Sequence, residues 1–469
     1  MTKRYSSLAL AALLVGCTVG PDYHRPESRV SSQWLEPAAE GQVDAEWWRS
    51  FDDPQLSALV ERALGSSPDL REAEARLTEA RANRDAARGG RLPQATVAGS
   101  ATRNVLSENG QLLVANIPGF DRSFPLYDIG FDASWELDFW GKQRRSVEAA
   151  DSRVDAAMWG RRDARVMLIA ELARAYVDLR GAQADLAIAE DGLAAQTELA
   201  SLLHLRFRAG EANRIEADRQ ESQRAGAQAA RDVLAAQVAA ATYRIAVLVG
   251  ERPEDIVADL RQPGAIPEPP ATIVSGVRSE LLERRPDVRR AERELAAATA
   301  SIGVAKADLF PRFSLTGTIG QQARDPGDIT SGGSTRLTIG PTFSWPIFSA
   351  GRIRAQVRAA DARAEAAAAR YEKAVVGALA DSESAANRFG NASSAAQAAR
   401  VALERETNAY DLVKLRVSRG EDDRLALMQA RLKHAEALRQ ERDAAAARAS
   451  AAIALYKSLG GGWSGEPES

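Results

Sequence analysis

The sequence has few of the residues that usually carry chemistry. It contains one cysteine, so no disulfide can form within the chain. Its three histidines, His24, His204 and His434, are isolated from one another. No cluster with metal-ligand spacing, no nucleophile elbow and no phosphate-binding glycine loop occurs in the sequence. We therefore expect that the protein is not an enzyme and that it has no cofactor and no metal site.

A large charge imbalance and long apolar runs are also absent. The 61 basic and 64 acidic side chains leave a net charge of −3, which does not indicate binding to nucleic acid. After residue 16 no run of 18 or more apolar residues occurs, so we expect no membrane-spanning helix there. A chain without such a helix can cross a membrane only as a closed β-barrel. Aromatic residues are 6% of the chain whereas alanine occurs in long runs, a composition that favours closely packed helices.

The N-terminal residues are typical of a secretory signal. Two basic residues precede an apolar run over residues 8–15, which is followed by glycine and Cys17. The order Leu-Val-Gly-Cys resembles the lipobox of bacterial lipoproteins, which predicts a signal peptide over residues 1–16 and acylation, including palmitate, on Cys17. Several acyl chains together anchor a protein stably in a membrane, since each buried methylene contributes ~0.8 kcal/mol to the binding free energy. In enterobacterial lipoproteins, an aspartate directly after the acylated cysteine favours retention in the inner membrane. This chain has Thr18 at that position, so the resemblance to those sorting rules favours the outer membrane. The alternative is an uncleaved apolar N-terminus with an incidental cysteine.

One sequence pattern occurs twice along the chain. Pro68 recurs 218 residues later as Pro286, and Gly210 recurs 210 residues later as Gly420. Further glycines, prolines and tryptophans recur in the same order, which chance similarity between two alanine-rich halves would not produce. We therefore expect an internal two-fold repeat. The expected division is an extended N-terminal segment over residues 17–55, repeat 1 over 56–250, a proline-rich linker over 251–280, repeat 2 over 281–460 and a tail over 461–469.

Each repeat is predicted to contain a helix, two strands and two long helices. The first helix is expected to begin at Pro68, with Ser67 as its N-cap. Apolar and polar residues alternate from residue 128 to 139, which is the period of a strand with two different faces. Leu172 and Leu179 belong to a seven-residue repeat that is typical of coiled coils. The predicted β-hairpins lie at about residues 92–140 and 310–348, and the long helical hairpins at 142–249 and 352–459. The linker holds five prolines between residues 252 and 270 and is expected to be extended.

Four strands cannot close a membrane barrel alone, because even the smallest outer-membrane barrels have eight. Unpaired strand edges cannot face lipid, so several copies would have to share one barrel. We expect a mainly α, α+β fold in which a trimer forms a twelve-stranded outer-membrane β-barrel, continuous with a long α-helical barrel of coiled-coil hairpins. A soluble sandwich and a poreless periplasmic scaffold lipoprotein are the alternatives. The residues expected to line a wet barrel lumen are Asp128, Asp132, Glu136 and Asp138. Those expected to form an aromatic girdle are Trp135, Phe139, Trp140, Phe343, Trp345 and Phe348.

Several longer motifs are specific enough to compare with known families. They are CTVGPDYHRP at residues 17–26, the segment 48–59, WELDFWGK at 135–142, LERRPDV at 282–288 and LFPRFSLTG at 309–317. Together they resemble the TolC-like outer membrane factor family, in its lipoprotein branch, over nearly the whole chain.

The resemblance implies a homotrimer in the outer membrane whose α-helical tunnel extends into the periplasm. A periplasmic adaptor (membrane fusion) protein would open its inner end and join it to an inner-membrane transporter, most often of the resistance-nodulation-division type. The expected function is the outer-membrane channel of a tripartite efflux system, a passive exit duct for drugs or other small solutes. The alternative within the same family is an outer-membrane duct for type I protein secretion.

The same resemblance places adaptor docking at the two helix-turn-helix tips, where a glycine permits a tight reversal. Capping turns with solvated charges are the alternative. Many family members place aspartates beyond the second tip, where this chain has Ala426 and Gln429. The expected docking residues are Leu205, Arg206, Ala209, Gly210 and Glu211 with Leu415, Arg416, Arg419, Gly420 and Glu421. The substitute candidates for a pore constriction are Glu216, Asp218, Asp422 and Asp423.

Overall fold

The chain folds into two compact units. A computed structural model describes residues 18–27, 31, 33–36, 41–107 and 121–464. The sheet unit comprises Met1–Pro26, Leu77–Ala156 and Ala291–Tyr371, and the helical unit comprises Glu27–Arg76, Ala157–Arg290 and Glu372–Ser469. Each unit combines parts of both sequence repeats. The compact units therefore differ from the predicted division at residues 56–250 and 281–460, because four helices run from one unit into the other.

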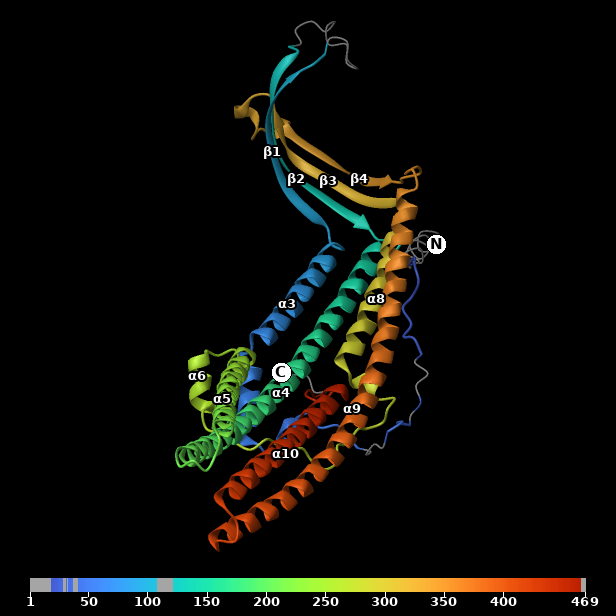
Figure 1. Cartoon of the computed structure of the whole chain (residues 1–469). Coiled ribbons are helices and arrows are strands. Elements are labelled where there is room, and N and C mark those ends of the chain that lie inside the picture. Colours follow the sequence, from blue (N-terminus) through green and yellow to red (C-terminus); the bar gives the residue numbers. More distant parts are fainter. Residues whose placement is uncertain (1–17, 28–30, 32, 37–40, 108–120, 465–469) are drawn as a thin grey trace. The chain divides into compact units, whose positions relative to one another are not determined.

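The same order of elements occurs twice along the chain (Figure 1). A helix is followed by two antiparallel strands, a helix of 67 residues and a returning helix. The first set is α3 (Pro68–Gly89), β1 (Gln94–Val105), β2 (Ser123–Leu137), α4 (Lys142–Arg208) and α5 (Arg214–Val249). The second set is α8 (Pro286–Ala307), β3 (Arg312–Ala323), β4 (Thr335–Ser344), α9 (Arg352–Ser418) and α10 (Arg424–Ser458). Shorter helical segments are η1 (Trp47–Phe51), α2 (Pro54–Ser66), α6 (Pro253–Leu260), α7 (Leu281–Arg284), η3 (Pro326–Asp328) and η4 (Gly332–Ser334).

The linker predicted as extended chain contains the helix α6. Pro253 lies in its first turn, where the missing N–H of proline costs no hydrogen bond. Ile256 and Leu260 on this helix are buried in the core of the helical unit. The prediction of an extended linker is therefore wrong for residues 253–260, whereas residues 261–270 contain no helix or strand. Proline disrupts the interior of a helix but is favourable in its first turn. The number of prolines in a segment therefore does not exclude a helix, because it does not show where they lie in that helix.

The four strands form one antiparallel sheet in the order β1-β2-β3-β4 (Figure 1). In the register, Asp132 lies opposite Thr96 on one side and Thr318 on the other, and Thr318 lies opposite Thr338. Because side chains alternate between faces along a strand, this register brings polar positions of all four strands to one face. The apolar positions lie on the other face. The alternation read from the sequence thus becomes a sheet with one polar and one apolar side.

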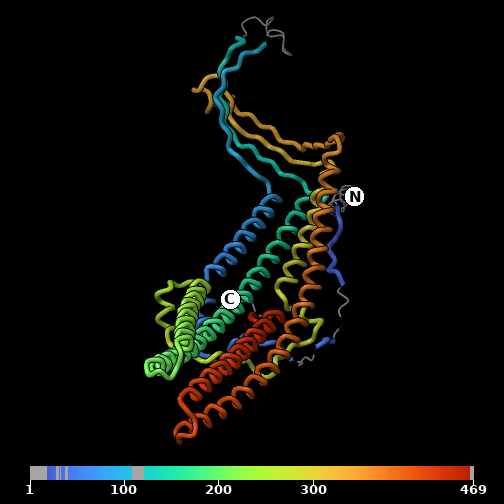
Figure 2. The backbone as a smooth tube through the Cα atoms, viewed as in Figure 1, coloured from blue at the N-terminus to red at the C-terminus, as the bar shows by residue number. Residues whose placement is uncertain are grey.

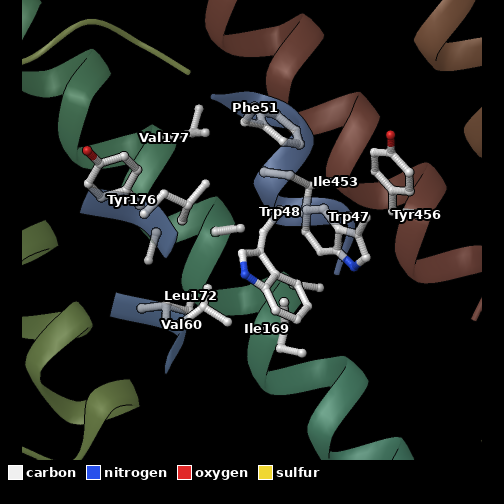
Figure 3. Close-up of a cluster of buried hydrophobic side chains, with 14 of the residues drawn as sticks. Trp47, Trp48, Phe51, Val60, Ile169, Leu172, Tyr176, Val177, Ile453 and Tyr456 are labelled. Carbon is white, nitrogen blue, oxygen red and sulfur yellow. The ribbon is translucent and has the colours of Figure 1, made fainter. Parts of the chain in front are cut away.

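The core of the helical unit lies around η1, in the segment that was predicted to be extended (Figure 3). Trp47, Trp48 and Phe51 are no more than 3% exposed. Trp47 stacks on Tyr456 of α10, with 5.0 Å between ring centroids and 11° between planes. Large buried aromatic side chains dominate the energy of a core, so this short turn is a major part of the hydrophobic core. The heptad residue Leu172 on α4 is fully buried in the same cluster.

The N-cap predicted at Ser67 is not formed by its side chain. Ser67 is 1% exposed, and its Oγ has no hydrogen-bond partner among the described residues. The turn at Gly250 encloses this junction, because a Cβ there would lie 2.7 Å from Cδ of Pro68. The side chain that caps a helix nearby is Asp53, whose carboxylate accepts two backbone N–H groups in the first turn of α2, both at 2.9 Å.

The long helices form two helical hairpins, α4 with α5 and α9 with α10 (Figure 2). The heptad stripe on α4 is fully buried at Leu179, whereas Phe207 at its end is 37% exposed. Among the described residues, α5 is the one helix long and apolar enough to cross a membrane by length and composition. Gln237 and Arg244 interrupt its apolar part, so it contains no unbroken run of 18 apolar residues. Ile245 and Val249 of α5 are fully buried in the core of the helical unit.

Candidate functional site

The apolar face of the sheet is widely exposed. Ile129 and Phe131 of β2 are 53% and 60% exposed, and Leu337, Ile339 and Phe343 of β4 are 68% to 72% exposed. A contiguous apolar surface of this kind is unfavourable in water and marks a site of contact with lipid or another apolar partner. An apolar outer band is the feature that outer-membrane strands present to lipid.

The opposite face of the sheet carries carboxylates. Asp128, Asp132 and Glu136 share this face, because they lie at alternate positions of β2. The Asp128 carboxylate accepts hydrogen bonds from Nε and Nη2 of Arg336, at 2.9 and 2.7 Å, and from Nε2 of Gln322 at 2.8 Å. The structure thus keeps three of the four predicted lumen residues on one face and adds a cation that the sequence analysis did not include.

The fourth predicted lumen residue, Asp138, has a different role. It lies beyond the end of β2, and its carboxylate accepts the backbone N–H groups of Gln143 and Arg144, at 3.0 and 2.9 Å. These contacts make Asp138 a cap for the first turn of α4, where a negative charge is favourable. This capping role is not among the predictions from the sequence, and the place of Asp138 in a lumen stays a prediction. The alternation of residue types continues past the strand, but the strand itself ends at Leu137.

Aromatic side chains gather at one end of the sheet. Phe313 and Phe343 are paired in the register of β3 and β4, and the rings of Phe139 and Phe313 are 5.3 Å apart. The indole N–H groups of Trp135 and Trp345 donate to backbone carbonyls at 2.9 and 3.1 Å. Aromatic side chains with one polar atom satisfied and an apolar body exposed suit a membrane interface.

An N-terminal strap, residues 18–26, lies against α4 and α8 within the sheet unit. The N–H of Val19 donates to the carbonyl of Trp140 at 3.1 Å. Gly20 has φ of 100° and faces Gly303 so closely that a Cβ on Gly20 would lie 2.5 Å from the Gly303 Cα. Glycine is required at Gly20 both for its backbone angle and for this approach of two backbones.

Two polar side chains fix the strap further along. Asp22 accepts from the Nη2 of Arg145 at 2.6 Å, and the side chain of Arg145 is 4% exposed. The Tyr23 hydroxyl donates to the Glu292 carboxylate at 2.8 Å, and burial together with this bond raises the pKa of Tyr23. The predicted lipidation site, Cys17, lies outside the described residues, directly before the strap.

Both helical hairpins reverse through the same kind of turn. At the first tip, the N–H of Gly210 donates to the carbonyl of Phe207 at 3.0 Å, and that of Glu211 to Arg206 at 2.8 Å. These are the two bonds of a Schellman motif. The φ of Gly210 is 78°, in the left-handed region that a side chain disfavours. The predicted turn glycine therefore has the conformation that its position required.

The second tip repeats this geometry. Gly420 has φ of 75°, and the N–H of Glu421 donates to the carbonyl of Arg416 at 2.9 Å. The Arg416 side chain forms ion pairs with Glu421 and Asp422, at 3.8 and 3.0 Å, while at the first tip the corresponding Arg206 to Glu211 distance is 4.0 Å. Each tip also exposes a large apolar side chain. These are Leu205 and Leu415, which are 56% and 44% exposed.

The four acidic side chains predicted as a pore constriction have local partners. Two of them cap helices and two form ion pairs. For one of them the signal is present in the sequence, because the order Asn-x-x-Glu after the first turn is the signature of a capping box. Glu216 forms this capping box with Asn213, Asp423 accepts from the N–H of Ala426 at 2.8 Å, Asp218 pairs with Arg214 at 3.4 Å and Asp422 pairs with Arg416 at 3.0 Å.

Ion pairs also connect α10 to α4, and the sequence analysis did not predict them. Each joins an arginine of α10 to a carboxylate of α4, in antiparallel order along the two helices. No local pattern could have identified them, because the partners are more than 200 residues apart and their pairing depends on how the two hairpins pack. The pairs are Arg424 with Glu198 at 2.7 Å, Arg431 with Asp191 and Arg442 with Asp185.

The arrangement of strands and helical hairpins matches a known family. The family model of outer membrane efflux proteins matches residues 59–251 and 277–461, which together are more than half of the chain. The chain belongs to the outer membrane efflux protein family. Its members are channel proteins, and in the part of this efflux protein that the structure describes, no group of three or more His, Cys, Asp or Glu side chains could hold a metal ion.

Individual relatives agree with this assignment. The efflux protein is 32% identical to the outer membrane protein OprJ of Pseudomonas aeruginosa, over 98% of this chain and 95% of the relative. It is 30% identical to the toluene efflux pump outer membrane protein TtgF of Pseudomonas putida, over 99% of this chain and 98% of the relative. The solved structure of the outer-membrane channel OprN is 37% identical, with a TM-score of 0.83, and the match covers 95% of this chain and 100% of that one.

These findings confirm three predictions from the sequence. The fold is that of the TolC-like channels, and the protein is an outer-membrane efflux channel. The predicted location in the outer membrane is confirmed as well, whereas the lipid anchor on Cys17 stays a prediction.

Proposed function

We propose that this efflux protein works as a homotrimer whose three sheets close into one twelve-stranded barrel. The observation that carries the proposal is the sheet, which has one polar face, one exposed apolar face and, among the described residues, no partner strand at the outer edges of β1 and β4. Backbone groups on an open edge are too costly to leave unpaired in lipid, so the edges would pair between copies. The polar face, with Asp128, Asp132 and Glu136, would then line a water-filled lumen.

The strap supports a lipid anchor on Cys17. Val19 is held by the carbonyl of Trp140, beside the aromatic side chains at the end of the sheet. An acylated residue two positions before Val19 would place its acyl chains close to this aromatic region, where a membrane interface is expected. The protein would then be held in the outer membrane by its barrel and by its lipid together.

The two helical tips would dock a periplasmic adaptor protein. Gly210 and Gly420 form closed turns of equal geometry, and the exposed Leu205 and Leu415 provide an apolar contact beside the arginine and glutamate of each tip. The adaptor would connect the channel to an inner-membrane transporter of the resistance-nodulation-division type. The transporter would supply the energy, and this chain would act as a passive duct without catalysis.

The cargo would be drugs or other small solutes. This part of the proposal is supported by relatives whose names include a toluene efflux pump and an antibiotic efflux pump. Near the tips, Glu216 and Asp423 would be the better candidates for a constriction, because their carboxylates accept backbone N–H groups, whereas Asp218 and Asp422 are each paired with an arginine.

The channel is tested by reconstitution of the purified full-length protein in planar lipid bilayers. We expect trimers that resist sodium dodecyl sulfate until heated, and stepwise ion conductance after insertion. A monomer in detergent without conductance would contradict the proposal. A trimer without conductance would also contradict the channel and would favour the alternative of a poreless scaffold.

A further inference from the structure

Arg336 is the charged residue of β4, and it lies on the polar face of the sheet. Its Cα pairs with Gly320 of β3, which in turn pairs with Gly130 of β2. The guanidinium extends across β3 and reaches Asp128 on β2. The side chain thus spans three strands of the surface that the proposed channel would turn toward its lumen.

Two glycines lie beside this path. A Cβ on Gly130 would lie 3.2 Å from Nη2 of Arg336 and 2.8 Å from the carbonyl oxygen of Ile319. A Cβ on Gly320 would lie 2.5 Å from the carbonyl oxygen of Ile129. A side chain at Gly130 would therefore meet the guanidinium, and one at Gly320 would meet the backbone of β2. Glycine at Gly130 leaves the space that the guanidinium needs, and glycine at Gly320 lets β2 and β3 approach closely.

The contact with Asp128 has a fixed geometry. Two guanidinium nitrogens of Arg336 each contact one carboxylate oxygen, at 2.9 and 2.7 Å, and Gln322 donates to the same carboxylate at 2.8 Å. Paired bonds of this kind are short, directional and stronger than single contacts between neutral groups. Asp132 and Glu136 have no ion-pair partner among the described residues. On the polar face of β2, Asp128 therefore has a directly paired cation, whereas Asp132 and Glu136 carry no direct ion pair within the described part of the chain.

We propose that Arg336 sets the ion selectivity of the barrel exit by cancelling the charge of Asp128. The proposal rests on the proposed channel, in which three copies would place three such pairs around one lumen. Charges on the wall of a narrow aqueous pore act on permeating ions because low-dielectric walls focus their field. With Arg336 present, each chain contributes the charge of two carboxylates from β2. Without Arg336, each chain contributes the charge of three carboxylates from β2.

The test measures the reversal potential of trimers in planar bilayers under a potassium chloride gradient. Arg336→Gln should raise the ratio of potassium to chloride permeability by about two-fold or more, and Asp128→Asn should lower it by a similar factor. The double variant Arg336→Gln with Asp128→Asn should return the ratio to that of the unmodified protein. Arg336→Lys keeps the charge and should leave the ratio unchanged.

These arms separate a charge effect from a purely structural one. A pair that only stabilises the sheet would give equal selectivity in all conducting variants, which would overturn the proposal. If Arg336→Gln yields no trimer, Asp128→Asn and Arg336→Lys still decide, because only a charge effect predicts a shift in the first and none in the second. Unmodified trimers that never conduct would instead contradict the proposed channel itself.

Discussion

Glycines and carboxylates at a few positions hold the strap and start the long helices. Gly20 and Gly303 bring two backbones into contact, and Arg145 binds both the strap carbonyls and the Asp22 carboxylate. The Arg145 side chain is almost fully buried, so loss of its partners would leave a charge in the protein interior. The strap is therefore a close-packed part of the sheet unit.

The first prediction concerns this contact between glycines. Gly303→Ala places a Cβ 2.7 Å from both the Val19 carbonyl oxygen and Cγ of Arg145, and both cannot be accommodated without moving the strap. We expect a loss of stability of about 2 kcal/mol, in the range for overpacking of a close contact. The expected result is faster protease cleavage within residues 18–26.

Gly340→Ala is the matched control, since a Cβ there has no heavy atom within 4 Å. It should be cleaved at the rate of the unmodified protein. Equal protease resistance in Gly303→Ala and Gly340→Ala would show that the strap is not packed as described.

Some residue roles could be predicted from the sequence and others could not. The turn glycines Gly210 and Gly420 were predictable, because a helix that reverses tightly needs a left-handed residue. Asp138 was placed in the lumen because alternation does not reveal where a strand ends. The pairing of Arg336 with Asp128 could not be predicted, since it depends on the register of strands that are about 200 residues apart in the chain.

At the scale of elements, the two tips have the same turn geometry in both repeats. The turns at Gly210 and Gly420 share their backbone hydrogen bonds, and each tip exposes a leucine, Leu205 or Leu415. Since neither leucine is buried within the chain, its side chain is available to a partner. This gives the docking proposal a test that leaves the fold intact.

The second prediction is that the double variant Leu205→Ala with Leu415→Ala weakens efflux without loss of trimer. Truncation of exposed side chains changes stability by about 0.5 kcal/mol or less. The loss of two apolar anchors at an interface should lower drug resistance about four-fold or more. The measurement is the minimum inhibitory concentration in cells that supply the cognate adaptor and transporter.

Val233→Ala on α5 is the control, because Val233 is 58% exposed and lies away from both tips. It should keep full resistance with the same amount of trimer. Full resistance in the double leucine variant would remove these side chains from the docking surface.

Most elements could be predicted because their signals are local. Alternation over residues 128–137 gave a strand and its two faces, and proline at Pro68 and Pro286 marked the first residues of α3 and α8. Helix α6 could not be predicted from the number of prolines in the linker, because one of these prolines, Pro253, begins the helix. Helix η1 was missed because a short turn has no period, although Trp47 and Trp48 are among the most buried side chains of the helical unit.

At the scale of the whole molecule, the sequence repeat and the compact units divide the chain differently. Equivalent parts of both repeats join in one sheet, so β2 pairs with β3 and not only with β1. This pairing unites the two halves but leaves β1 and β4 as open edges. No sequence pattern could specify that pairing, because either strand of each hairpin could have been the inner one.

In the proposed trimer, β1 of one copy pairs with β4 of another. Within one chain, β1 and β4 are three strand steps apart, or ~14 Å at 4.7–4.9 Å per step. A disulfide cannot join Cα atoms more than ~7 Å apart, so cysteines on these two strands can be bridged only between copies.

The decisive measurement is therefore disulfide cross-linking in membranes, with Val97→Cys on β1 combined in turn with Leu337→Cys, Ile339→Cys and Phe343→Cys on β4. At least one combination should give covalent dimers and trimers on heated, non-reducing gels, and the single-cysteine variants should not. Folded, membrane-inserted protein that gives only monomers in every combination would contradict this pairing between copies.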